Sequence, residues 1–159
     1  MSDPRTTLAG AQATRPPGLP GRIVVGIDGS EEASRALQWA IEEARLRSAV
    51  LEIVSTWYLP GYGWGDVTPA PGDPGLQFAA NARGMVEEAA SQARLALPGI
   101  EVVATALEGS PAAVLVELSK DAGLLVVGSR GRGGFKGLLM GSVSQECTAH
   151  ALCPIVIVH

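Results

Sequence analysis

The sequence predicts one α/β domain in which a sheet of five parallel strands is covered by helices on both faces. Five short apolar runs rich in β-branched residues have the character of buried strands, at residues 23–27, 51–57, 101–107, 124–127 and 155–158. Helical patterns separate these runs, so strands and helices alternate along the chain. A chain of 159 residues, 47% of them hydrophobic, suffices for one such domain with its own core.

The first helix is predicted over residues 30–48. Ser30 stands where an N-cap belongs, followed by Glu31 and Glu32 in the first turn, while Arg45 and Arg47 occupy the last turn, as the helix dipole favours. The apolar residues fall on one face with a period of 3.6, namely Ala33, Ala36, Leu37, Ala40, Ile41 and Ala44. This face is expected to pack on the sheet.

Three further helices follow the second, third and fourth strands. The second covers residues 76–97, and its expected buried face comprises Phe78, Ala82, Met85, Val86, Ala89, Ala93 and Leu97. The third opens at Ser110-Pro111, a cap followed by proline at the first helical position, and is expected to end at Gly123. The fourth begins at Ser142, with Ser142 as N-cap and Gln145 reaching back in a capping box.

Composition excludes several classes of protein. The formal net charge of −4 provides no general attraction for nucleic acid or an anionic membrane surface, and no apolar run approaches the roughly 20 residues of a membrane span. Residues 1–21 are rich in proline, glycine, threonine and arginine and lack the apolar region of a signal peptide. We expect a disordered tail over 1–21, a single domain over 22–159 and a cytoplasmic protein. The two cysteines and two histidines match no metal-binding pattern.

The stretch from Val126 to Ser142 holds six glycines, at positions 128, 131, 133, 134, 137 and 141. It follows the fourth strand and leads into the fourth helix, the context in which backbone amides and a helix N-terminus bind phosphate. The other interpretation is a flexible loop in which Ser142 only caps the helix. Arg130, Arg132 and Lys136 form a local basic patch within it, and Arg130 is a candidate phosphate ligand or, alternatively, a solvated side chain.

Two further segments flank this loop at the carboxyl edge of the predicted sheet. Asp28 follows the first strand and is placed to accept hydrogen bonds from ribose hydroxyls, or to form a turn that caps the first helix. Residues 58–75 form a long loop, and the aromatic residues Trp57, Tyr58, Tyr62 and Trp64 lie at its start. Those rings either stack on a purine or cover the end of the sheet.

The spacing of the glycines identifies the kind of nucleotide motif. Neither a Walker pattern nor a dinucleotide fingerprint after the first strand occurs. Gly128, Gly131, Gly141 and Ser142 instead form the pattern G-x2-G-x9-G-[ST]. With the opening "IVVGIDGSEEASRAL" and the closing "CPIVIVH", this pattern resembles the ATP-binding branch of the universal stress protein family, and the resemblance extends from about residue 22 to residue 159.

The resemblance implies a Rossmann-like, doubly wound sheet of strand order 3-2-1-4-5 that binds ATP where the strand order reverses. By motif, Gly128, Gly131, Gly141 and Ser142 are expected to hold the phosphates and ribose, with any Mg²⁺ bound through the phosphates. Asp28 is expected to face the ribose and adenine, and Thr56 to contact the adenine. Relatives in the family also imply a homodimer through the strand at 155–158, which would otherwise be an uncharged sheet edge.

These observations favour an ATP-binding stress-response or regulatory module that acts as a nucleotide-dependent sensor. A cyclic-nucleotide (cAMP) binding protein would use the same loop, and the two remain alternatives. A slow ATP hydrolase is the alternative of another class, since the chain shows no assembled base and metal clamp of the kind that fast phosphoryl transfer requires. An ATP pyrophosphatase is disfavoured because residues 26–30, "GIDGS", lack a serine-glycine-glycine loop after the first strand.

Overall fold

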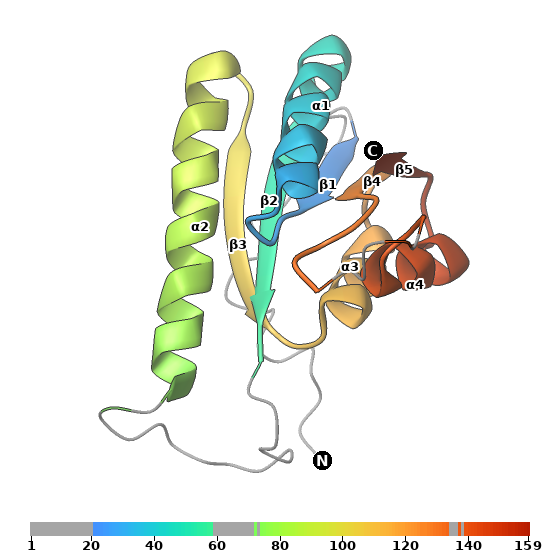
Figure 1. The fold of residues 1–159 in the computed structure, drawn as a ribbon. Helices are drawn as coiled ribbons and strands as arrows, with labels where there is room; N and C mark the ends of the chain where they lie inside the picture. Colours follow the sequence, from blue (N-terminus) through green and yellow to red (C-terminus); the bar gives the residue numbers. More distant parts are fainter. Residues whose placement is uncertain (1–20, 59–71, 73, 134–136, 138) are drawn as a thin grey trace.

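The computed structural model describes residues 21–58, 72, 74–133, 137 and 139–159, which form a five-stranded parallel sheet flanked by four helices (Figure 1). The strands are β1 (Arg22–Gly26), β2 (Val50–Trp57), β3 (Val102–Glu108), β4 (Leu124–Gly128) and β5 (Ile155–Val158). The helices are α1 (Glu31–Arg47), α2 (Pro74–Ala96), α3 (Pro111–Ser119) and α4 (Ser142–His150). Residues 1–20 of the expected tail and the aromatic residues Tyr62 and Trp64 lie outside the described residues.

The strand order is β3-β2-β1-β4-β5, and every pairing is parallel, which confirms the predicted fold class. Helices α1 and α2 cover one face of the sheet, and α3 and α4 lie on the other (Figure 1). The next two strands along the chain, β2 and β3, lie on one side of β1, and the last two, β4 and β5, lie on its other side. The order therefore reverses between β1 and β4, at the centre of the sheet.

Alternate residues of the strands supply the two apolar cores, as the two-residue period of a strand requires. On the α1 and α2 side, Ile23 and Leu51 pack with the alanines of both helices. On the α3 and α4 side, Val24 and Val54 pack with Leu115 and the buried thiol of Cys147. The small alanine side chains of α1 let this helix lie close to β1 and β4, next to the carboxyl ends of both strands.

The helix boundaries correct three sequence predictions. α2 begins at Pro74, and Phe78 is 48% exposed, so its assignment to the buried face was wrong. The expected residues Ala82, Val86, Ala89 and Ala93 are buried, and the buried stripe of α2 also contains Ala79 and Ala90. α3 ends at Ser119, before Gly123. By contrast, the Ser30 cap of α1 is confirmed, since its Oγ accepts a hydrogen bond from the N–H of Ala33 at 3.1 Å.

A buried carboxylate ties three strands together on the α3 face. Glu52 of β2 is 6% exposed; its Oε2 lies 2.5 Å from Nη1 of Arg22, and its Oε1 accepts a hydrogen bond from the hydroxyl of Thr105 at 2.8 Å. Arg22 also donates to the carbonyl of Leu118 at the end of α3, at 3.0 Å. The charge is therefore both paired and hydrogen-bonded, the condition under which a carboxylate is tolerated inside a protein.

None of the helices within the described ranges has the length and hydropathy of a membrane-spanning segment.

Candidate functional site

The glycine-rich loop begins at the carboxyl end of β4, and its last residue, Gly141, lies next to its first residue, Ser129. The N–H of Gly141 donates to the carbonyl of Ser129 at 2.7 Å, and the N–H of Ser129 donates to the carbonyl of Val158 at 2.7 Å. The buried hydroxyl of Ser144 donates to the carbonyls of Gly128 and Ser129, at 2.7 and 3.1 Å. These bonds hold the first turn of α4 against the carboxyl end of β4.

The N-cap of α4 is Gly141, in an extended conformation, and Ser142 is the first helical residue. The predicted capping box was therefore wrong, because closure of the loop through the N–H of Gly141 puts the glycine at the cap position. The amide of Gln145 donates instead to the carbonyl of Met140 at 3.2 Å. Glycine has no side chain with which to accept hydrogen bonds, so the first N–H groups of α4 receive no cap from a side chain.

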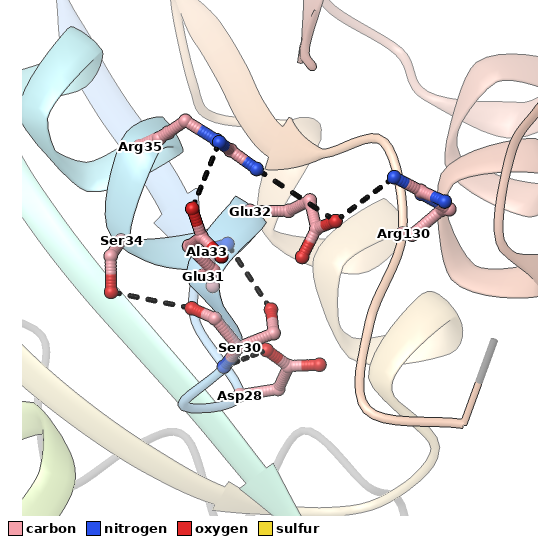
Figure 2. Close-up of polar contacts among 8 residues, drawn as sticks. All are labelled: Asp28, Ser30, Glu31, Glu32, Ala33, Ser34, Arg35 and Arg130. Atoms are coloured by element: carbon pink, nitrogen blue, oxygen red, sulfur yellow. Dashed lines mark hydrogen bonds and ion pairs between the residues drawn. The ribbon is translucent and has the colours of Figure 1, made fainter. Parts of the chain in front are cut away.

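Asp28 connects the loop after β1 to the glycine-rich loop. Its Oδ1 accepts a hydrogen bond from the N–H of Ser30 at 2.9 Å, and its Oδ2 accepts one from the N–H of Arg132 at 3.0 Å. The carboxylate thus forms the turn that precedes α1 and at the same time touches the loop that follows β4 (Figure 2 shows its bond to Ser30). The turn interpretation of Asp28 agrees with these bonds, and the contact with a ribose stays a prediction.

Three of the predicted glycines lie close together, each against a different neighbour. A Cβ atom at position 131 would lie 2.5 Å from Oδ2 of Asp28, and one at position 141 would lie 3.4 Å from Cα of Arg130 and 3.6 Å from the nitrogen of Gly131. A Cβ atom at position 128 would lie 2.9 Å from the carbonyl carbon of Glu32 and 3.0 Å from its oxygen. Gly128 is therefore required for the packing of β4 against α1, a role that the motif did not suggest.

Arg130 makes an ion pair instead of standing free in solvent. Its Nη2 lies 3.3 Å from Oε1 of Glu32, and the same carboxylate oxygen lies 3.9 Å from Nη2 of Arg35. Figure 2 shows the side chain of Glu32 between the two guanidinium groups. Sequence reasoning placed Glu32 in the first turn of α1 only for its effect on the helix dipole. The sequence signal for Glu32 was its position four residues after Asp28, because residues so near each other in sequence belong to the same turn between β1 and α1.

Thr56 lies near the carboxyl end of β2 and is half-buried, with Leu107 as its partner in β3. Gly26 of β1 pairs with Val54 of β2. Asp28 lies two residues after Gly26, and Thr56 lies two residues after Val54. The two residues therefore end neighbouring strands at the same edge of the sheet. Lys136 lies outside the described residues.

A pocket of about 170 Å³ lies between α1 and α2 and is lined in part by Gly29. None of the predicted site residues lines it. Within the described part of the chain, no three histidine, cysteine, aspartate or glutamate side chains are grouped so as to hold a metal ion. Among the described residues, the polar groups at the carboxyl ends of β1 and β4 include backbone N–H groups, hydroxyls, Asp28, and Arg130 with its partner Glu32. This combination suits a small anionic ligand that carries hydroxyl groups.

Comparison with known proteins shows the family. The model of the universal stress protein family matches residues 20–159, and the chain belongs to this family. Universal stress protein Rv2623 of Mycobacterium tuberculosis is 38% identical over 143 residues, which cover 86% of this chain and 47% of that protein. Universal stress protein Rv2005c of the same species is 33% identical over 146 residues, with the same coverage. The chain thus spans about half the length of the curated relatives it matches.

Solved structures share the fold over nearly the whole domain. Universal stress protein UspA from Lactobacillus plantarum superposes with a TM-score of 0.75 at 21% identity, over 87% of this chain and 97% of that one. A universal stress protein in complex with cAMP has a TM-score of 0.67 at 31% identity, over 89% and 98% of the two chains. The protein from Archaeoglobus fulgidus in complex with dAMP has a TM-score of 0.62 at 27% identity, over 89% and 99%.

Proposed function

We propose that this protein binds ATP at the carboxyl ends of β1 and β4 and acts as a nucleotide-dependent regulatory module. The observation that carries this proposal is the convergence of Gly131, Gly141 and Asp28 at the point where the strand order reverses. Gly141 lies against the backbone of Arg130 and Gly131, and it caps the N-terminus of α4. Such an arrangement favours phosphate groups.

Each predicted residue has a role in this proposal that its position permits. The backbone around Gly131 and Gly141, together with the Ser142 hydroxyl and first N–H groups of α4, would bind the phosphates. Arg130 would add a charged contact to them. Asp28 would accept hydrogen bonds from the ribose, and Thr56 would approach the adenine from the end of β2. Gly128 would contribute indirectly, by allowing α1 to lie against β4.

Asp28 can accept a ribose hydroxyl in addition to its present backbone partners. Both of its oxygens already accept backbone hydrogen bonds, from Ser30 and from Arg132. A carboxylate oxygen has two lone pairs, so Asp28 can accept a ribose hydroxyl while keeping the bond to Ser30. The same commitment argues against Asp28 as a fast general base, and we propose at most slow hydrolysis of ATP.

Cyclic AMP is the second candidate ligand, because the related structure that is 31% identical is described as a complex with cAMP. A cyclic monophosphate would use the same loop but would present one phosphate charge. Mg²⁺, if it takes part, would be held through the phosphates of ATP. The domain that binds nucleotide is proposed to comprise residues 22–159, without the tail at 1–21.

The test is calorimetric titration of the full chain with ATP and with cAMP, together with native mass spectrometry of the freshly purified protein. Tighter binding of ATP than of cAMP supports the proposal, and the reverse order favours the cyclic nucleotide. Absence of binding to either would contradict a nucleotide site. A phosphate-release assay on the same preparation distinguishes a binding module from a hydrolase.

A further inference from the structure

Glu32 lies in the first turn of α1, and its side chain contacts Arg130 of the glycine-rich loop. Its side chain is 18% exposed, and its Oε1 lies 3.3 Å from Arg130 and 3.9 Å from Arg35. Since Arg35 lies on the same helix, the pair with Arg130 is the one that joins the helix to the loop. Arg130 is thus drawn toward α1 by a carboxylate (Figure 2).

The backbone of Glu32 packs directly against Gly128, the residue from which the loop starts. The space where a Cβ atom of residue 128 would lie is filled by the carbonyl group and the Cβ atom of Glu32, at 2.9 to 3.0 Å. The end of β4, from which the loop starts, therefore rests directly on this residue. The carboxylate of Glu32 can move only as far as rotation of its own side chain allows, whereas the side chain of Arg130 can rotate toward a ligand.

From this geometry we propose that Glu32 competes with the ligand's phosphates for Arg130 and thereby sets how strongly the site discriminates by phosphate number. This inference rests on the proposed nucleotide site. A guanidinium that contacts a phosphate must loosen its contact with Glu32, and the carboxylate also repels nearby phosphate oxygens. Both effects grow with the negative charge of the ligand. Glu32 therefore weakens the binding of ATP more than that of AMP, and leaves adenosine unaffected.

The test is calorimetric titration of the full chain and its variants with adenosine, AMP and ATP, with EDTA present so that phosphate charges are bare. Glu32→Gln keeps the shape of the side chain and removes its charge. We expect ATP affinity to rise about three- to tenfold, AMP affinity by less than about twofold, and adenosine affinity not at all, as expected for one unit charge a few ångströms from screened phosphates. An unchanged ratio of ATP to AMP affinity in this variant would overturn the inference.

Glu31→Gln is the matched control, because it removes the same charge from the same helical turn. Glu31 pairs with Arg35 at 3.1 Å, and its side chain is 81% exposed. We expect the ratio of ATP to AMP affinity to stay at the wild-type value. An equal gain in both variants would mean that the general field of the helix terminus is responsible, and not the pair with Arg130.

A double-mutant cycle shows whether Glu32 acts through Arg130. In the Arg130→Gln background, Glu32→Gln should raise ATP affinity by clearly less than in the wild type, because no guanidinium remains to be released. An undiminished gain in that background would contradict the competition. If the wild-type chain bound neither AMP nor ATP, the proposed function would fail first and this inference with it. Wild-type binding with no effect of Glu32→Gln would overturn the inference alone.

Discussion

The spaced glycines of the loop after β4 exclude a side chain for different physical reasons. Gly131 leaves room for the carboxylate of Asp28, whereas Gly128 leaves room for the backbone of α1 at Glu32. A carboxylate at the end of a side chain can move aside, but helix backbone cannot do so without displacing its neighbours. Substitution at the two positions should therefore have different consequences, one for binding and the other for stability.

Gly131→Ala should weaken nucleotide binding without unfolding the protein. The new Cβ atom would displace Asp28 Oδ2 and cost its bond to the N–H of Arg132. We expect ATP affinity to fall by at least about tenfold in calorimetry, equivalent to roughly 1.4 kcal/mol, with an unchanged circular dichroism spectrum. Gly133→Ala is the control in the same loop, because none of the described residues lies within 4 Å of its Cβ position. Equal losses in both variants would contradict the assigned contact.

Gly128→Ala should instead lower the stability of the whole domain. Its Cβ atom would overlap the carbonyl group of Glu32, so α1 has to move away from β4. Overpacking of this kind costs about 1–3 kcal/mol, which chemical denaturation measures directly. Gly84→Ala on α2 is the contrasting change, since its Cβ position is open, and it should stabilise by up to about 1 kcal/mol. A Gly128→Ala variant as stable as the wild type would show that the close approach is not required.

At the scale of elements, β4, the loop and α4 form a unit that is closed by side-chain and backbone hydrogen bonds. The hydroxyl of Ser144 reaches from the first turn of α4 to the carbonyls of Gly128 and Ser129. Gly128 is the last paired residue of β4 and Ser129 follows it, and the carbonyl of Ser129 also receives the N–H of Gly141. The position of the N-terminus of α4 relative to the sheet thus depends on a backbone bond and on one buried hydroxyl.

Ser144→Ala should loosen this unit. The variant leaves buried carbonyl groups short of a donor, which costs about 1–3 kcal/mol. We expect faster amide hydrogen exchange in the segment 129–145 than in the wild type, while the strands β1 and β2 keep their protection. Ser91→Ala provides the control, because Ser91 also donates to a carbonyl, that of Glu87 at 2.9 Å, but from an exposed position. Similar exchange in the loop of both variants would contradict a role for Ser144.

Much of the element structure could be predicted because its causes are local. Ser30 caps α1 through a bond to a residue three positions away, and such bonds depend on little else. The start of α4 could not be predicted in the same way. Gly141 became the cap because its N–H bonds to Ser129, twelve residues earlier, and the sequence does not show that contact. Phe78 was misplaced because apolarity alone does not distinguish a buried stripe from the exposed end of a long helix.

At the scale of the whole molecule, alternation of strands and helices predicts a parallel sheet but not the order of its strands. That order followed from the family resemblance, and it is what brings Asp28 beside the glycine-rich loop, more than 100 residues later in the chain. The ion pair between Arg130 and Glu32 was likewise invisible, because it depends on the same crossing. The sequence therefore indicated candidate residues on separate loops, whereas the contacts between those loops could not be predicted.

The edge strand β5 has a free side whose backbone groups can be assigned. Pro154 and Val158 both accept hydrogen bonds from β4 through their carbonyls. Because alternate residues of a strand direct their backbone groups to the same side, those of Ile155 and Ile157 point away from β4. All four residues of β5 are half-buried, and none is charged. Such an edge favours pairing with a second copy across a two-fold axis.

We therefore expect a homodimer through β5, with a mass of about twice the 16.4 kDa chain in light scattering at micromolar concentration. Ile157→Pro removes an N–H from the free edge and keeps the bonds between β5 and β4, so it should shift the protein toward monomer. Ile157→Ala truncates the same side chain but retains the N–H, and this control should remain more dimeric. Val156→Pro acts on the side that faces β4 and should instead reduce thermal stability. A wild-type protein that stays at the mass of one chain across this concentration range excludes the dimer. Equal dissociation of Ile157→Pro and Ile157→Ala would assign the contact to side chains and not to the strand edge.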